Sequence, residues 1–137
     1  LYAVRGLFNA AITDTTLKYL KYYTSKRLLG EHVPYAVEAW PEGDQRHLAA
    51  ESGLYCRAIT EGLFGMQPKS FKSFLLLPYL PAGWKEMSLN HIRAFNKDFN
   101  ITVARAGQKL KIIVEQAGSK KQEINWDGRK AVEINLY

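Results

Sequence analysis

Hydrophobic positions recur every three to four residues through the first half of the chain, a spacing that is typical of helices. From about Asn9 to Leu29 the pattern is helical, and one stripe of it holds Ile12, Thr16, Leu20, Tyr23 and Arg27. Thr13 offers a second start for this helix because threonine is a favoured N-cap, and Gly30 marks the expected end. Residues 1–8 fit either the tail of a helix or a connector.

A second helix is predicted over residues 48–64. Its residues are small or apolar on nearly every side, and the charged ones are only Glu51, Arg57 and Glu61. Such a helix needs neighbours on most of its surface, more than one other helix can supply. We therefore expect the isolated chain to self-associate or to rearrange its helices, since a large exposed apolar patch is uncommon in monomers.

After Gly65-Met66-Gln67-Pro68 the pattern changes to alternation, which is typical of strands. Strands are expected near residues 71–77, 87–94, 99–105, 109–116, 121–126 and 130–136. Asp127-Gly128 predicts a two-residue hairpin between the last two of them. The predicted class is α+β, with two to three α-helices followed by an antiparallel β-sandwich or sheet. The corresponding domains are a helical segment, 1–66, and a C-terminal antiparallel β domain, 67–137.

Composition narrows the choice of partner. The chain has 137 residues, is 47% hydrophobic and carries a net charge of +6 from 19 Lys+Arg and 13 Asp+Glu. The basic residues are scattered among acids, and the densest patch, near the C-terminus, fits a solvated sheet face. We therefore expect no nucleic-acid partner. No run of 18 apolar residues occurs, so no membrane association is expected either.

Metal and cofactor chemistry are not expected. The three histidines, His32, His47 and His91, lack the spacing of metal ligands, and Cys56 is the single cysteine. No glycine-rich loop of the phosphate-binding kind occurs. The prediction is therefore no metal and no cofactor.

Carboxylates gathered around an aromatic residue are the remaining candidate chemistry. Between the two predicted helices, Glu38, Glu42 and Asp44 surround Trp40, in a segment whose prolines and Gly43 oppose regular structure. Paired carboxyl groups can act as acid and base in glycosyl transfer, and a tryptophan offers a flat face for a sugar ring. The alternative is structural, with the acids capping the helix near Leu48 and pairing with Arg46.

Two runs of sequence resemble the C-terminal part of a six-hairpin (α/α)6-barrel glycoside hydrolase. They are VEAWPEGDQRHLAAESGLYCRAITEGLFGMQP (residues 37–68) and SFKSFLLLPYLPAGW (residues 70–84), and the whole resemblance covers residues 9–137. The likeness is to bacterial proteins of the α-L-rhamnosidase type. The positions that match the end of the last barrel helix and the strand after it are Gly65, Met66, Pro68, Phe71, Leu77 and Pro78.

The resemblance implies roles for individual residues. Glu38 matches the general base that this family carries before its last barrel helix, with Glu42 as the second choice. His47 matches a sugar-contacting histidine, and Trp40, Asp44 and Arg46 are the further substrate-binding candidates. The family's Thr-Thr-x-Trp-Glu signature is absent, because Trp40 follows Glu38 here, and the loop between Glu38 and His47 is shorter than usual.

The resemblance also implies partners. The substrate is expected to be an oligo- or polysaccharide, and the catalytic acid is expected on upstream barrel helices of a longer parent chain, so this piece should be inactive alone. The absence of an initiator Met agrees with that expectation. The implied location is periplasmic or secreted. The alternative is a non-catalytic carbohydrate-binding or structural β-sandwich module with the helices as a stalk, but the apolar 48–64 helix favours the enzyme.

Overall fold

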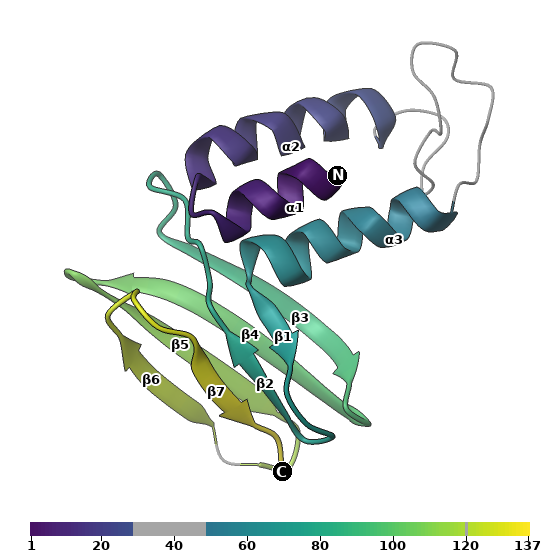
Figure 1. Ribbon diagram of the computed structural model, residues 1–137. Helices are drawn as coiled ribbons and strands as arrows, with labels where there is room; N and C mark the ends of the chain where they lie inside the picture. Colours follow the sequence, from purple (N-terminus) through teal and green to yellow (C-terminus); the bar gives the residue numbers. More distant parts are fainter. Residues whose placement is uncertain (29–48, 120) are drawn as a thin grey trace. The chain divides into compact units, whose positions relative to one another are not determined.

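The computed structural model describes residues 1–28, 49–119 and 121–137 (Figure 1). The chain divides into two compact units, Leu1–Leu63 and Phe64–Tyr137, and each is described by itself. Helices form the first unit and antiparallel strands form the second. The predicted α+β class, with helices first and strands after, is confirmed.

The first unit contains α1 (Tyr2–Asn9), α2 (Thr13–Arg27), α3 (Ala49–Arg57) and a π-helical continuation of α3, η1 (Ala58–Leu63). The prediction of one helix starting at Asn9 is wrong, because the chain turns between α1 and α2. Ala11 has a φ of 60°, its N–H donates to the Phe8 carbonyl at 2.8 Å, and the Ile12 N–H donates to the Leu7 carbonyl at 3.0 Å. These two bonds form a Schellman C-cap, and alanine occupies the position that glycine usually takes.

Helix α2 begins at Thr13, which is the second start that the sequence offered. Ile12 occupies the N-cap position, and the Thr16 hydroxyl donates to the Ile12 carbonyl at 2.5 Å. Helix α2 ends at Arg27, and the predicted stop at Gly30 lies outside the described residues.

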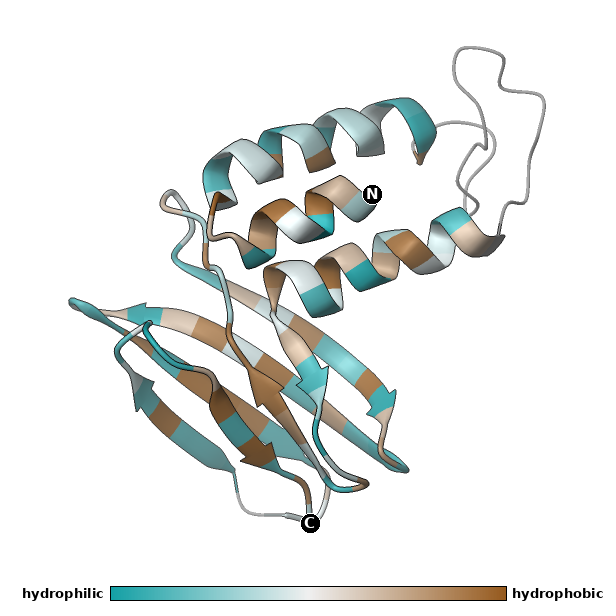
Figure 2. Cartoon of the chain, in the orientation of Figure 1, coloured by the Kyte–Doolittle hydropathy of each residue, from teal (hydrophilic) through white to brown (hydrophobic). Residues whose placement is uncertain are grey.

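The core of the first unit lies where α1 meets α2 and η1. Its buried side chains are Val4, Phe8, Thr16, Leu20, Ala58 and Leu63. A Cβ on Gly62 would lie 3.1 Å from Cδ2 of Phe8, so the absence of a side chain at Gly62 lets η1 approach α1 closely. Figure 2 shows apolar and polar residues interspersed along these helices.

The second unit contains two antiparallel sheets. The three-stranded sheet has the order β1-β2-β7, and the four-stranded sheet has the order β3-β4-β5-β6. The strands are β1 (Met66–Pro68), β2 (Ser73–Leu76), β3 (Glu86–Ala94), β4 (Lys97–Ala106), β5 (Lys109–Gln116), β6 (Gln122–Trp126) and β7 (Val132–Asn135).

Side chains from both sheets share one apolar core. The Phe74 ring on β2 is fully buried and stacks on the Phe99 ring of β4, with 5.6 Å between ring centroids. On β5, Ile112 and Val114 are buried whereas the residues between and after them are not, so the predicted half-buried strand over 109–116 is confirmed. The arrangement is that of a small β-sandwich.

The predicted hairpin at Asp127-Gly128 is wrong. Strand β6 pairs with β5, and β7 pairs with β2, so the chain crosses from one sheet to the other at this turn. The turn itself is local and tight: Gly128 has a φ of 82°, and the Asp127 carboxylate accepts the Arg129 N–H at 3.0 Å. The Trp126 ring, directly before the turn, is buried in the core, and its Nε1–H donates to the Lys130 carbonyl at 2.7 Å.

A short strand was missed just after the helices. β1 pairs with β2, with Met66 opposite Leu76 and Pro68 opposite Phe74. The strand predicted over 71–77 begins only at Ser73, and Phe71 lies in the β1–β2 turn with 95% of its surface exposed. A three-residue strand that ends in proline gives too short an alternation to be recognised from sequence.

Candidate functional site

The six residues that the sequence singles out all lie in one segment, 29–48, outside the described residues. They are Glu38, Trp40, Glu42, Asp44, Arg46 and His47. Their roles therefore stay predictions. The structure describes the frame on either side of that segment, formed by the end of α2 and the start of α3.

An ion pair joins the two ends of this frame. Arg27, the last residue of α2, lies with Nη1 3.1 Å from Oε1 of Glu51 in the first turn of α3, and both side chains are at least three-quarters buried. An ion pair that is partly withdrawn from water is screened less than an exposed one. The pair therefore links the last turn of α2 to the first turn of α3.

A hydrogen bond one turn further along repeats this link. The Thr24 hydroxyl donates its single proton to the Leu20 carbonyl at 2.8 Å, so Tyr55 must be the donor in the 3.0 Å bond between the Tyr55 and Thr24 hydroxyls. The Tyr55 ring also stacks on Tyr23, with 6.1 Å between centroids. Helices α2 and α3 are thus linked by the Arg27–Glu51 ion pair, by the Thr24–Tyr55 hydrogen bond and by the stacked tyrosines.

Tyr23 lies at the centre of this frame. The Arg27 guanidinium lies 5.5 Å from its ring centroid. Its hydroxyl is buried and makes no hydrogen bond of ordinary geometry among the described residues, although it interacts with the Arg27 guanidinium and the Glu51 carboxylate. Burial first, and then the negative charge of Glu51, raise the pKa of Tyr23, so the phenol is neutral at physiological pH.

A groove of about 670 Å³ borders Tyr23. Helix α2 contributes three tyrosines and a lysine to its lining, and α1 contributes mainly aliphatic side chains. The Arg27–Glu51 pair also lines the groove. The lining residues are Leu1, Ala3, Val4, Leu7, Tyr19, Tyr22, Tyr23, Lys26, Arg27 and Glu51. The candidate residues predicted from the sequence do not include this surface. The spacing of 19, 22, 23 and 26, which places all four residues on one helix face, is the signal that could have found it.

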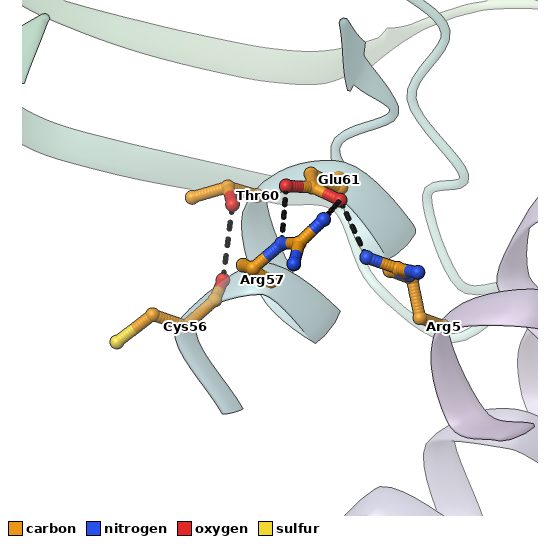
Figure 3. Close-up of polar contacts among 5 residues, drawn as sticks. All are labelled: Arg5, Cys56, Arg57, Thr60 and Glu61. Atoms are coloured by element: carbon orange, nitrogen blue, oxygen red, sulfur yellow. Dashed lines mark hydrogen bonds and ion pairs between the residues drawn. The ribbon is translucent and has the colours of Figure 1, made fainter. Parts of the chain in front are cut away.

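A second polar cluster joins α1 to η1 (Figure 3). Glu61 accepts from Arg5 at 2.8 Å and from Arg57 at 2.6 and 3.0 Å. The hydrogen bond from Arg57 is the main reason that the pKa of Glu61 is lowered. An ionised carboxylate held between two guanidinium groups is a structural clamp and a poor proton donor.

The π-helical geometry falls on the same residues. The Thr60 hydroxyl donates to the Cys56 carbonyl at 3.1 Å, a bond from a side chain to the preceding turn that commonly distorts a helix (Figure 3). Cys56 itself is exposed. The charged residues predicted on this helix, Glu51, Arg57 and Glu61, are therefore all engaged in ion pairs.

A further polar site in the second unit lies at a bulge in β3. His91 has a φ of 55°, is exposed, and lies with Nδ1 3.8 Å from Oδ1 of Asp98. In the parts of the chain that the structure describes, no three His, Cys, Asp or Glu side chains gather as a metal would require. Within the same parts, none of the helices has the length and apolar character needed to cross a membrane.

Comparison of the chain with models of known families, with curated proteins and with solved structures found no match.

Proposed function

We propose that this chain is the C-terminal part of a glycoside hydrolase that cleaves glycosidic bonds in oligo- or polysaccharides, of the six-hairpin barrel type and similar to α-L-rhamnosidases. In this proposal the helices belong to the last hairpin of the barrel. Segment 29–48 supplies the general base, Glu38, or Glu42 as the second choice. The catalytic acid belongs to upstream helices of a longer parent chain.

The observation that carries the proposal is the bonded frame around the acid-rich segment. The Arg27–Glu51 ion pair and the Thr24–Tyr55 hydrogen bond hold α2 and α3 together beside the points where that segment begins and ends. Catalytic side chains on a loop need such a fixed base, because errors of an ångström in their position lower the rate strongly.

The connection between helix and sheet gives secondary support. Gly65, Met66, Pro68, Leu77 and Pro78 are among the residues on which the resemblance rests. Met66 and Pro68 form the ends of β1, and the Leu77 N–H donates to the Gly65 carbonyl at 3.2 Å. Phe71 is the exception, since it lies exposed in a turn.

The proposed chemistry assigns each residue of the segment a task. Ionised Glu38 takes a proton from the attacking water as the bond to the anomeric carbon forms. Trp40 stacks on a sugar ring, while His47, Asp44 and Arg46 bind hydroxyl groups of the substrate. An upstream carboxylic acid, about 6.5–9.5 Å from Glu38 in an inverting enzyme, protonates the leaving oxygen.

A second candidate is a non-catalytic carbohydrate-binding or structural module. The observation in its favour is that residues 64–137 form a compact β-sandwich with a core of their own. Under this reading the acid-rich segment only caps α3 and carries no chemistry.

The test is hydrolysis by the intact parent enzyme with Glu38→Gln, which keeps the shape of the side chain but removes its basicity. We expect kcat to fall by about 10²–10⁴-fold with KM nearly unchanged. Glu42→Gln is the matched control, because it changes the same residue type in the same segment. If only Glu42→Gln is inactive, the base is Glu42. If both variants keep full activity, the proposal fails and the second candidate is favoured.

A further inference from the structure

The turn between β6 and β7 contains the single Asp-Gly pair of the sequence, Asp127-Gly128, and the sequence has no Asn-Gly pair. An aspartate before a glycine is chemically reactive, because the next backbone nitrogen can attack the side-chain carboxyl and glycine has no side chain to shield that nitrogen. A Cβ on Gly128 would meet no described atom within 4 Å, so the fold leaves this residue open. Among the described residues, the Gly128 N–H has no hydrogen-bond acceptor.

The hydrogen bonding of the turn brings the two reacting groups together. Oδ1 of Asp127 accepts the Arg129 N–H at 3.0 Å, which makes an Asx turn. The ring of atoms that this bond closes includes both the Asp127 carboxyl carbon and the Gly128 nitrogen, so the two are held near one another. Gly128 has a φ of 82°, a conformation that glycine adopts without strain.

The other aspartates of the chain do not combine these features. Each of them is followed by a residue with a side chain. Asp14 lies in the first turn of α2, where the helix fixes the backbone, and Asp98 lies in β4, with Oδ2 3.5 Å from Nε of Arg93. Asp44 lies outside the described residues.

We propose that Asp127-Gly128 is a modification site at which the folded chain converts Asp127 to isoaspartate without an enzyme. The Gly128 nitrogen forms a bond to the carboxyl carbon of Asp127, the nitrogen's proton and the carboxyl OH leave as water, and a succinimide ring results. Water then adds to either ring carbonyl and breaks its bond to the nitrogen, which restores aspartate or yields isoaspartate. The mass is unchanged, but in isoaspartate the backbone runs through the side chain and is longer by one carbon atom. Nothing in this chemistry depends on the proposed function.

The position of the turn gives the modification a structural effect. The turn carries the chain from one sheet to the other, because β6 pairs with β5 and β7 pairs with β2. Across it, the Trp126 Nε1–H donates to the Lys130 carbonyl at 2.7 Å. An extra backbone atom between these two residues disturbs this bond and moves the carboxylate away from the Arg129 N–H. We therefore expect isoaspartate to loosen β7, whereas β5 and β6 keep their pairing.

The test is storage of the 137-residue chain at neutral pH and physiological temperature. Isoaspartate is measured with a protein isoaspartate methyltransferase as reagent and located by peptide mapping. We expect it to accumulate over weeks at Asp127 and not at Asp98. Asp127→Glu is the matched control, because it keeps a carboxylate but closes the larger ring much more slowly, so this position should stay unmodified. Asp127→Asn should react faster through the same ring, with ammonia leaving in place of water.

A peptide of residues 122–132 separates the contribution of the fold from that of the sequence. Because the Asx turn holds the reacting groups together, the folded chain should convert at least as fast as this peptide. The proposal is overturned if Asp127 stays unmodified in the folded chain while the peptide converts. It is also overturned if Asp127→Glu accepts as many methyl groups as the unaltered chain.

Hydrogen exchange of the modified chain measures the structural effect. The amides of β7 should exchange about fivefold faster than in the unmodified chain, which corresponds to the loss of about one hydrogen bond, and those of β5 should be unchanged. Equal exchange of β7 before and after modification would overturn the proposed loosening of this strand.

Discussion

Gly65 is the residue whose replacement should reveal most about the helix-to-strand connection. It has a φ of 60°, and a Cβ at this position would lie 2.1 Å from the Leu77 carbonyl oxygen and 2.7 Å from its carbonyl carbon. The Leu77 N–H donates to the Gly65 carbonyl at 3.2 Å. Gly65→Ala therefore combines a left-handed backbone with a clash against backbone atoms of Leu77, the residue directly after β2.

The expected cost follows from these two terms. A left-handed conformation costs a non-glycine residue about 1–2 kcal/mol. Moving Leu77 away to relieve the clash weakens a backbone hydrogen bond worth about 1 kcal/mol and disturbs the packing around it. We expect Gly65→Ala to lower the free energy of unfolding of the second unit by at least about 2–3 kcal/mol, a large part of the stability of a typical domain.

Gly107→Ala is the matched control. Gly107 has a φ of 64°, but a Cβ there would meet no atom within 4 Å, so only the conformational cost of about 1–2 kcal/mol applies. Urea unfolding followed by hydrogen exchange of the β2 and β7 amides measures the second unit specifically. If Gly65→Ala costs no more than Gly107→Ala, the close approach of Leu77 does not constrain the connection, and the reasoning is wrong.

Two further predictions follow from burial and charge. Phe74→Ala removes a fully buried ring that stacks on two others, and it should lower the free energy of unfolding measured in urea by about 3–5 kcal/mol. Phe71→Ala, at a 95% exposed position, should change that free energy by less than about 0.5 kcal/mol. Equal effects of the two substitutions would contradict the placement of the two rings. The pKa of Glu61 is lowered in the folded chain, mainly by the hydrogen bond from Arg57. The ionised carboxylate therefore stabilises the fold fully at pH values above 4.5, its ordinary pKa, and this stabilisation is lost as the pH falls through the pKa of the folded state. Glu61→Gln should therefore flatten the acid side of the stability profile of the first unit, measured by hydrogen exchange of its α1 amides, and an unchanged profile would contradict the clamp.

The sequence by itself determined the class of the fold, because the two periodicities are properties of the side chains alone. The 3.6-residue stripe through Thr16 and Leu20 and the alternation through Ile112 and Val114 each appear in the structure as predicted. Such patterns persist because a helix or a half-buried strand must turn its apolar side chains to one side. Candidate chemistry was also found from sequence, as the acid-rich segment around Trp40.

Helix ends and turns were predicted less well where they use an unusual residue or join unexpected strands. At the break between α1 and α2, Ala11 has the left-handed conformation that glycine usually adopts after the end of a helix, so the sequence gives no clear stop signal there. The Asp127-Gly128 turn forms, but it joins two different sheets. Which strand pairs with β7 depends on the core that Phe74 and Ile134 share across β2 and β7, and no local signal carries that information.

Tertiary structure alone decided which residues gather in the groove. Tyr23 and Arg27 stand on a predicted helix, but the approach of Glu51, 24 residues from Arg27, comes from the packing of α3 against α2. The same packing buries the Tyr23 hydroxyl. Periodicity shows which side of a helix faces inward. The residues that this side contacts come from distant parts of the chain, and they are determined by packing in three dimensions and not by neighbours in sequence.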